Sequence, residues 1–173
     1  MEFLNSIKEM IPDFAKDIRL NIDGTIARSS LTGNDAVGVA LAAAFAAKSR
    51  PIIDVILASG ALAPEESQAA LTASALMGMN NIWYPYLDMA DDADLKSQPA
   101  QLRMNAYASN GGVDKRRFEM YALAASIVGK CHFCVKSHFE LLKHEGMSAV
   151  QLRDVGRIAA VINAASQVIA ASR

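Results

Sequence analysis

The spacing of apolar residues is the feature that most constrains the fold of this 173-residue chain. Apolar side chains recur at intervals of three and four residues, as in Phe118, Tyr121, Ala122 and Ala125, rather than at every second position. Alanine is abundant, above all in residues 40–47, and β-branched residues rarely cluster. These patterns predict an all-α protein.

Length and composition indicate one folded domain. No linker rich in glycine and serine divides the chain, so we expect a single helical domain over residues 1–173. Hydrophobic residues make up 52% of the chain, which is enough for a core and argues against disorder. The eight methionines, Met77 and Met79 among them, fit core filling better than a cofactor site.

Charge and hydropathy exclude several classes of partner. The 17 basic and 18 acidic residues give a net charge of −1 without a basic block, so neither nucleic acid nor an anionic membrane surface is an expected partner. The longest nearly pure apolar run, 37–47, is about half of a membrane span. The first residues do not resemble a signal peptide, and two cysteines cannot form a secreted disulfide framework. We therefore expect a cytoplasmic protein.

Capping signals place the helix boundaries. Proline suits the first turn of a helix, Asp and Ser cap N-termini, and glycine ends helices. We expect Gly129 to end the helix before the two cysteines, and residues 110–112 form the clearest loop. The expected helices cover residues 12–20, 34 or 35–48, 51–60, 64–77, 81–90, 114–128, 131–144 and 148 onward.

A short internal repeat suggests a duplicated unit. Residues 70–74 (ALTAS) match residues 122–126 (ALAAS) at four of five positions. Both copies are expected to form a helix, a tight turn and a second helix. The second copy, a hairpin over about 114–145, is the one that holds reactive side chains, because Cys131 in it corresponds to Met79 in the first.

Cys131 and Cys134 are the only cysteines of the chain. At this spacing they can close a disulfide or share a metal ion. If Cys131 lies at a helix start, free amides and the helix dipole stabilise a thiolate, which is the nucleophile in peroxide reduction and in disulfide exchange. The alternative is two buried cysteines that act as small apolar residues.

All three histidines lie in the same stretch. His138 follows Cys134 by one helical turn, so it can act as base or hydrogen-bond partner of that thiol. His132, inside the motif, either tunes thiol acidity or faces solvent. His144 is expected to interact with the dipole at the helix C-terminus, and a helical histidine can also be an ordinary surface or core residue.

Glu119 is a further candidate site residue, which the geometry of the expected hairpin places near His138. Counted from the expected turn, Glu119 and His138 lie at similar depths on two antiparallel helices. Facing side chains would form a relay from Glu119 through His138 to Cys134. The alternative is an exposed Glu119 that pairs with Lys115 or Arg116.

Zinc binding is a further alternative. Cys131, Cys134 and His138 offer three ligands, with a fourth from Glu119 or His144. Structural zinc sites usually draw two ligand pairs from separate loops, whereas these three lie on one expected helix. We therefore expect no bound metal.

The pattern of Glu119, eleven residues, Cys131-x-x-Cys134, three residues and His138 resembles the signature of the alkylhydroperoxidase D (AhpD) branch of the carboxymuconolactone decarboxylase-like family. The resemblance spans almost the whole chain, because residues 11–21, 25–30, 77–84 and 102–105 are also similar to family segments.

The resemblance implies an all-α homotrimer that reduces organic hydroperoxides. Cys134 would attack the peroxide, Cys131 would resolve the sulfenic acid as a disulfide, and His138 and Glu119 would relay the proton. No cofactor would be tightly bound. Electrons would come from dihydrolipoamide on a lipoylated acyltransferase, reduced by lipoamide dehydrogenase, and could pass on to a two-cysteine peroxiredoxin. Some relatives have a histidine directly before the second cysteine, where this chain has Phe133.

Two questions stay open at the level of sequence. The one-turn spacing to His138 favours Cys134 as nucleophile, but a CxxC motif more often uses its first cysteine in disulfide exchange. The alternative function is a dithiol electron carrier, an adaptor for a peroxiredoxin that does not itself react with peroxide. A lactone decarboxylase without redox chemistry is disfavoured, because the two cysteines would then be incidental.

Overall fold

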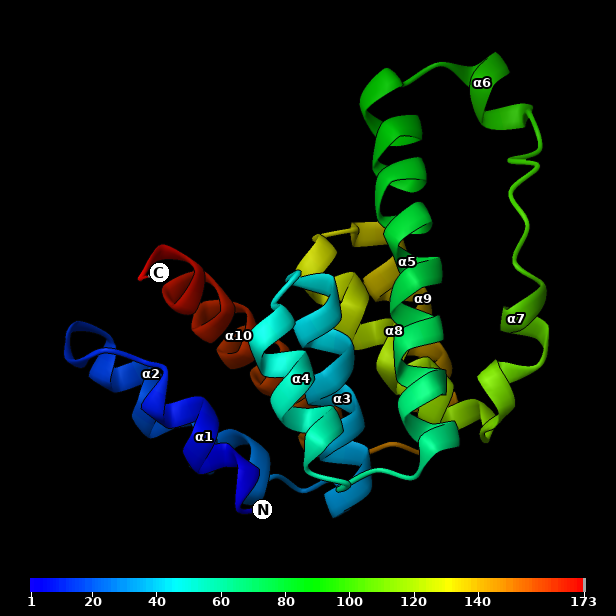
Figure 1. Cartoon of the computed structure of the whole chain (residues 1–173). Helices are drawn as coiled ribbons and strands as arrows, with labels where there is room; N and C mark the ends of the chain where they lie inside the picture. The colour runs from blue at the N-terminus through cyan, green and yellow to red at the C-terminus, as the bar shows by residue number, and fades with distance from the viewer. Residues whose placement is uncertain (173) are drawn as a thin grey trace.

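The structure, a computed structural model, describes residues 1–172 and consists there of helices without any strand. The predicted all-α class is confirmed. Nowhere in this part of the chain is a helix both long and apolar enough to cross a membrane. The elements (Figure 1) are α1 Phe3–Glu9, η1 Asp13–Ala15, α2 Lys16–Ile22, the π-helical η2 Asp23–Ala27, α3 Gly33–Ala46, α4 Arg50–Ala58, α5 Pro64–Ala90, α6 Ala93–Ser97, α7 Asn105–Ala108, η3 Asn110–Gly112, α8 Lys115–Gly129, α9 His132–His144 and α10 Ala149–Ala171.

Helices α3 and α8 form the centre of the fold. α3 buries ten consecutive residues that begin at Asp35, and α8 buries nine that begin at Phe118. A helix that is apolar on all sides needs neighbours on all sides, and α3 and α8 pack on each other, on α5 and on α10. Small residues permit this approach. A Cβ atom at Gly38 would lie 2.4 Å from the ring of Tyr121.

The repeated segments lie on α5 and α8, which pack against each other. The turn expected in the first copy is absent, because α5 runs unbroken from Pro64 to Ala90. The prediction of separate helices over 64–77 and 81–90 is therefore wrong. A single glycine such as Gly78 costs a helix only about 1 kcal/mol, and the contacts of α5 with α3 and α8 offset that cost.

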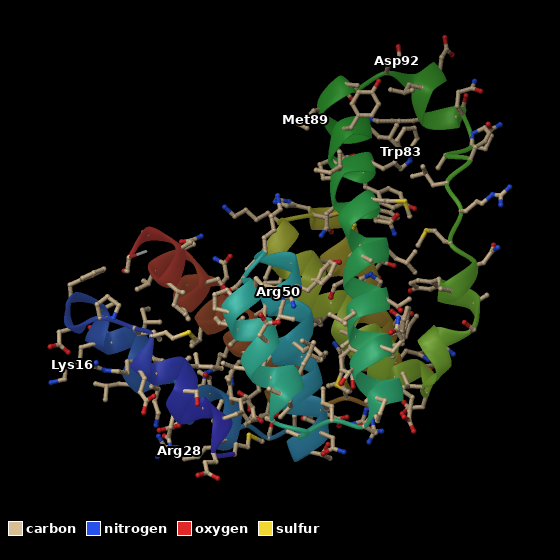
Figure 2. The ribbon with its side chains drawn as sticks, in the orientation of Figure 1. Lys16, Arg28, Arg50, Trp83, Met89 and Asp92 are labelled. Atoms are coloured by element: carbon tan, nitrogen blue, oxygen red, sulfur yellow. A yellow bond between two sulfur atoms is a disulfide. The ribbon has the colours of Figure 1, made fainter. Side chains whose placement is uncertain are left out.

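The second half of α5 extends away from the helix cluster (Figure 1). The chain then returns through α6, an irregular stretch and α7 to η3, which packs on α5. We call residues 82–104 the arm. Figure 2 shows Trp83 and Met89 on it, with Asp92 at its far end. Several large apolar side chains of the arm are exposed, among them Ile82 at 72% and Met89 at 80%.

Most helix boundaries follow the predicted caps. The side chain of Asp114 accepts a hydrogen bond from the Arg117 N–H, and that of Ser148 accepts one from the Gln151 N–H. α3 instead begins at Gly33 behind Thr32, whose Oγ1 accepts from the Asp35 N–H, so the predicted start at residue 34 or 35 is slightly late. The helices α1, α6 and α7 were not predicted, because they are too short to show a helical period.

Buried carboxylates connect distant segments of the chain at two places. Arg117 of α8 donates to Glu66 of α5 over 2.6 Å and to Asp35 of α3 over 3.0 Å. Asp154 of α10 accepts from both the N–H and the hydroxyl of Ser30, at 2.7 and 2.9 Å. Burial alone raises the pKa of the Asp154 carboxyl, but these bonds and two arginines outweigh burial and hold that pKa well below its usual range.

Candidate redox site

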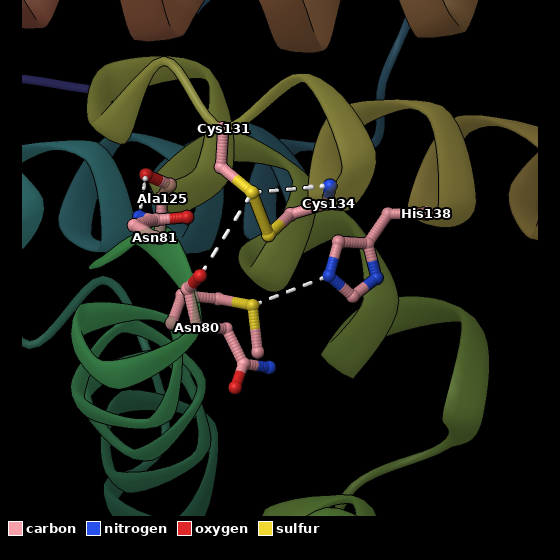
Figure 3. Close-up of a disulfide and its surroundings, with 7 residues drawn as sticks. Asn80, Asn81, Ala125, Cys131, Cys134 and His138 are labelled. Atoms are coloured by element: carbon pink, nitrogen blue, oxygen red, sulfur yellow. Dashed lines mark hydrogen bonds between the residues drawn. A yellow bond between two sulfur atoms is a disulfide. The ribbon is translucent and has the colours of Figure 1, made fainter. Parts of the chain in front are cut away.

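The two cysteines lie where α8 turns into α9. The left-handed residue at this turn is Lys130, with φ of 56°, rather than the expected Gly129, which is the last residue of α8. Gly129 serves another purpose. A Cβ atom there would lie 2.1 Å from Nδ2 of Asn81, which donates to the carbonyl of Ala125 over 3.0 Å. The turn is thus packed directly against α5 (Figure 3).

Cys131 and Cys134 form a disulfide, with their Cα atoms 5.3 Å apart. Cys131 is the N-cap of α9, and its Sγ accepts the Cys134 N–H over 3.2 Å. The same sulfur lies 3.9 Å from the carbonyl oxygen of Asn80 (Figure 3). Cys131 is fully buried. The helix-start environment that was expected to stabilise a thiolate therefore surrounds the sulfur of Cys131.

The structure brings Glu119 and His138 together as the hairpin spacing predicts. Nδ1 of His138 and Oε2 of Glu119 are 2.6 Å apart, and both side chains are buried. The alternative surface pairing of Glu119 does not occur, since Lys115 pairs with Glu145. Burial alone raises the pKa of Glu119, but the hydrogen bonds from His138 and Tyr107 prevail and lower it. An ionised carboxylate only accepts, so Nδ1 carries a proton and Nε2 is the nitrogen left for chemistry.

Sequence reasoning missed Tyr107 of α7, whose hydroxyl donates to Oε1 of Glu119 over 2.5 Å. Burial, followed by the bond to Glu119, raises the pKa of Tyr107 above its ordinary range, so the hydroxyl keeps its proton. The residues around Tyr107 have no helical period, and the side chain reaches Glu119 only because the arm returns the chain to α5. The only feature of the sequence that points to Tyr107 is its position twelve residues before Glu119.

Met77 has a contact that the prediction of core filling did not include. It is buried on α5 as expected, and its Sδ lies 3.2 Å from Nε2 of His138. Figure 3 shows the imidazole of His138 beside the disulfide. In this disulfide state, Nε2 of His138 therefore rests against a thioether sulfur.

A pocket of about 370 Å³ opens next to Cys134. Tyr84 of α5 and Phe133 of α9 stack on one of its sides, with ring centroids 4.2 Å apart and planes at 27°. Cys131 does not line the pocket, so the cysteine that a small molecule meets there is Cys134. The lining residues are Asn80, Tyr84, Met104, Tyr107, Ala108, Phe133, Cys134, Ser137 and His138.

The other two histidines stand apart from this arrangement. His132 and His144 are exposed on α9, and His144 is in its last turn, as expected. The zinc alternative gains no support from the part of the chain that the structure describes, since no three His, Cys, Asp or Glu side chains of residues 1–172 are grouped to hold a metal ion.

Comparisons with known proteins show which family this chain resembles. The family model described as "Carboxymuconolactone decarboxylase family" matches residues 93–173. A protein of Rhodospirillum centenum named "Alkyl hydroperoxide reductase AhpD" is 41% identical over 168 residues, which cover 96% of this chain and 90% of the relative. Proteins of the same name from Coxiella burnetii and Rhizorhabdus wittichii are 38% and 36% identical, each over 95% of this chain and 96% of the relative.

Proposed function

The chain belongs to the AhpD family of alkyl hydroperoxide reductases, and from this premise we propose that it reduces organic hydroperoxides through its cysteine pair. The observation that carries the proposal is the single constellation of the Cys131–Cys134 disulfide, the His138–Glu119 pair and the pocket. A dithiol that can close to a disulfide supplies the two electrons that a peroxide bond takes up on cleavage.

In the first step, the thiolate of Cys134 attacks the outer oxygen of the hydroperoxide. The O–O bond breaks, Cys134 becomes a sulfenic acid, and the organic alkoxide leaves as an alcohol after it takes a proton. The position of Cys134 on the pocket supports its role as nucleophile. His138 lines the same pocket and Glu119 orients its ring, so His138 is the group to take the thiol proton and return it to the alkoxide.

In the second step, the thiol of Cys131 attacks the sulfenic sulfur, water leaves, and the disulfide forms. The burial of Cys131 suits a resolving residue, because its thiol has to meet only the sulfenic acid on Cys134 and no molecule from solution. The complete half-reaction converts one hydroperoxide and two thiols into one alcohol, one water and one disulfide.

The disulfide is then reduced by an external dithiol, for which we propose dihydrolipoamide on a lipoylated acyltransferase, itself reduced by lipoamide dehydrogenase. No tightly bound cofactor takes part. Attack on the sulfur of Cys134 expels Cys131 as a thiolate, and the Cys134 N–H at the start of α9 stabilises that leaving group. The reduced Cys131 and Cys134 dithiol of this protein can in turn reduce a two-cysteine peroxiredoxin.

We further propose a homotrimer that works in the cytoplasm. The exposed apolar side chains of the arm support self-association, because isolated chains rarely display such a surface without a partner.

The test is the intact mass of the reduced protein after one equivalent of tert-butyl hydroperoxide. We expect the wild type to lose two hydrogens rapidly, and Cys131→Ser to gain one oxygen that a sulfenic-acid reagent traps. If a sulfenic acid were trapped only in Cys134→Ser, Cys131 would be the nucleophile and Cys134 the resolving residue. If none of the proteins reacts while its thiols are free, direct peroxide reduction is wrong and the adaptor function takes its place.

A further inference from the structure

Tyr107 stands between the pocket and the buried carboxylate of Glu119. Its ring lines the pocket together with Cys134 and His138. The ring meets Phe118 edge-on, with centroids 5.5 Å apart and planes at 83°, and lies 6.4 Å from the imidazole of His138. Its hydroxyl donates to Oε1 of Glu119, while Oε2 takes the bond from His138. The two carboxylate oxygens thus have separate donors from two different helices.

The surroundings of Glu119 show why the second donor matters. The side chain is 1% exposed and does not line the pocket, so solvent does little to stabilise its charge. His138 of α9 and Tyr107 of α7 face it, and Lys115 lies one turn earlier on α8, where it is engaged by Glu145. With one donor fewer, a buried carboxylate next to a protonated imidazole tends to take the proton and form a neutral pair.

We propose that Tyr107 is a positioning residue of the relay, which holds Glu119 as an oriented carboxylate so that the proton taken from Cys134 stays on His138. The inference rests on the proposed function. During the reaction the thiol proton moves to Nε2 of His138 and from there to the departing alkoxide. Tyr107 keeps its own proton throughout and exchanges none with the sulfur or the peroxide.

The test measures alkylation of Cys134 by iodoacetamide against pH, in reduced protein that carries Cys131→Ser so that one thiol reacts. For Tyr107→Phe we expect the rate at neutral pH to fall about tenfold, the effect typical of a lost hydrogen bond to a charged group, and the midpoint of the profile to move to higher pH. The control is Tyr86→Phe, an exposed tyrosine of α5 outside the pocket, which should reproduce the wild-type profile.

A second variant separates the hydrogen bond from packing. Replacement of Tyr107 by 3-fluorotyrosine keeps the ring in place and makes the hydroxyl a stronger donor, so the midpoint should move to lower pH. A tyrosine with a merely structural role would not produce opposite shifts in the two variants. Profiles of both variants that superimpose on the wild type would overturn the inference.

The readout also separates this inference from the proposed function. Alkylation uses no peroxide, so it decides the role of Tyr107 even if the wild type proves unable to reduce hydroperoxides. Failure of the wild type with tert-butyl hydroperoxide, together with opposite shifts in alkylation, would reject the peroxidase and retain the relay.

Discussion

Glu119 and His138 meet across the α8–α9 hairpin with 2.6 Å between a carboxylate oxygen and a ring nitrogen, although 19 positions separate them in sequence. Because Glu119 accepts from Nδ1 of His138, the packing of the hairpin keeps a proton on that nitrogen. It also leaves Nε2 of His138, which in this disulfide state rests against Met77, as the ring nitrogen that can exchange a proton at the pocket.

Replacement of Glu119 by Gln should therefore slow oxidation of the reduced protein by a hydroperoxide. The amide can present its NH₂ group to Nδ1 and favour the wrong tautomer, so we expect a loss of about 10²–10⁴ in the second-order rate constant. Stopped-flow kinetics of thiol loss would measure it. Glu140→Gln, an exposed carboxylate on α9, is the control, and a Glu119→Gln rate within twofold of the wild type would contradict the relay.

Phe133→Ala should weaken the binding of bulky hydroperoxides. The substitution removes the ring that stacks on Tyr84 beside Cys134. Aromatic contacts of this kind contribute about 0.5–1.5 kcal/mol, so KM for cumene hydroperoxide should rise about two- to tenfold, with little change for hydrogen peroxide. Phe139→Ala on an exposed position of the same helix is the control. Equal changes for both peroxides would show that the stack does not contact the organic group.

Gly129→Ala should destabilise the protein and disturb the motif, because a Cβ atom there would collide with Asn81. Overpacking of this kind costs about 1–3 kcal/mol in the free energy of unfolding, which chemical denaturation would measure. Gly156→Ala in α10 has no heavy atom within 4 Å of its added carbon and should be neutral or stabilising. If the two variants were equally stable, the turn and Asn81 would accommodate the added Cβ atom at little cost in free energy.

The contribution of Asp154 to stability should depend on pH. Its pKa is lowered in the folded state, so its contribution is present above the unfolded-state pKa near 3.8 and is lost as the pH falls through and below that value. Asp154→Asn should lower the free energy of unfolding by about 1–3 kcal/mol at pH 7. The difference in free energy of unfolding between Asp154→Asn and the wild type should narrow between pH 5 and pH 3. Asp54→Asn, in an exposed ion pair, should change little, and a gap for Asp154→Asn that stays constant would contradict this account.

Ile82→Asp should break the proposed homotrimer, because it places a charge on an exposed apolar position of the arm. Light scattering coupled to size exclusion would report the mass. Phe14→Asp alters an equally exposed apolar side chain in η1 and should leave the trimer intact. A monomeric wild type, or a trimer that survives Ile82→Asp, would argue against the arm as the interface.

The parts of the site that sequence predicted are those governed by local geometry. The rise per residue of a helix is constant, so two residues at matched distances from one turn must lie at the same depth, as Glu119 and His138 do. The N-caps at Asp114 and Ser148 were predictable for the same reason, since each depends on neighbours within three residues.

The parts that sequence did not predict depend on packing between distant segments. Tyr107 reaches Glu119 only through the path of the arm, and Met77 contacts His138 because α5 crosses the hairpin. The unbroken α5 is a similar case, since the contacts of its neighbours override the weak break at Gly78. No local pattern carries that information.

The burial of Cys131 behind Cys134 has a kinetic consequence. In the proposed mechanism, oxidant and reductant enter the same pocket in turn, since both react at the sulfur of Cys134, which lines the pocket. A hydroperoxide that occupies this pocket while Cys131 and Cys134 form the disulfide prevents the reducing dithiol from binding. Turnover should then follow alternating, ping-pong kinetics, and at a fixed dithiol concentration its rate should pass through a maximum as the hydroperoxide concentration rises. A protein of this design works best where its oxidant is scarce.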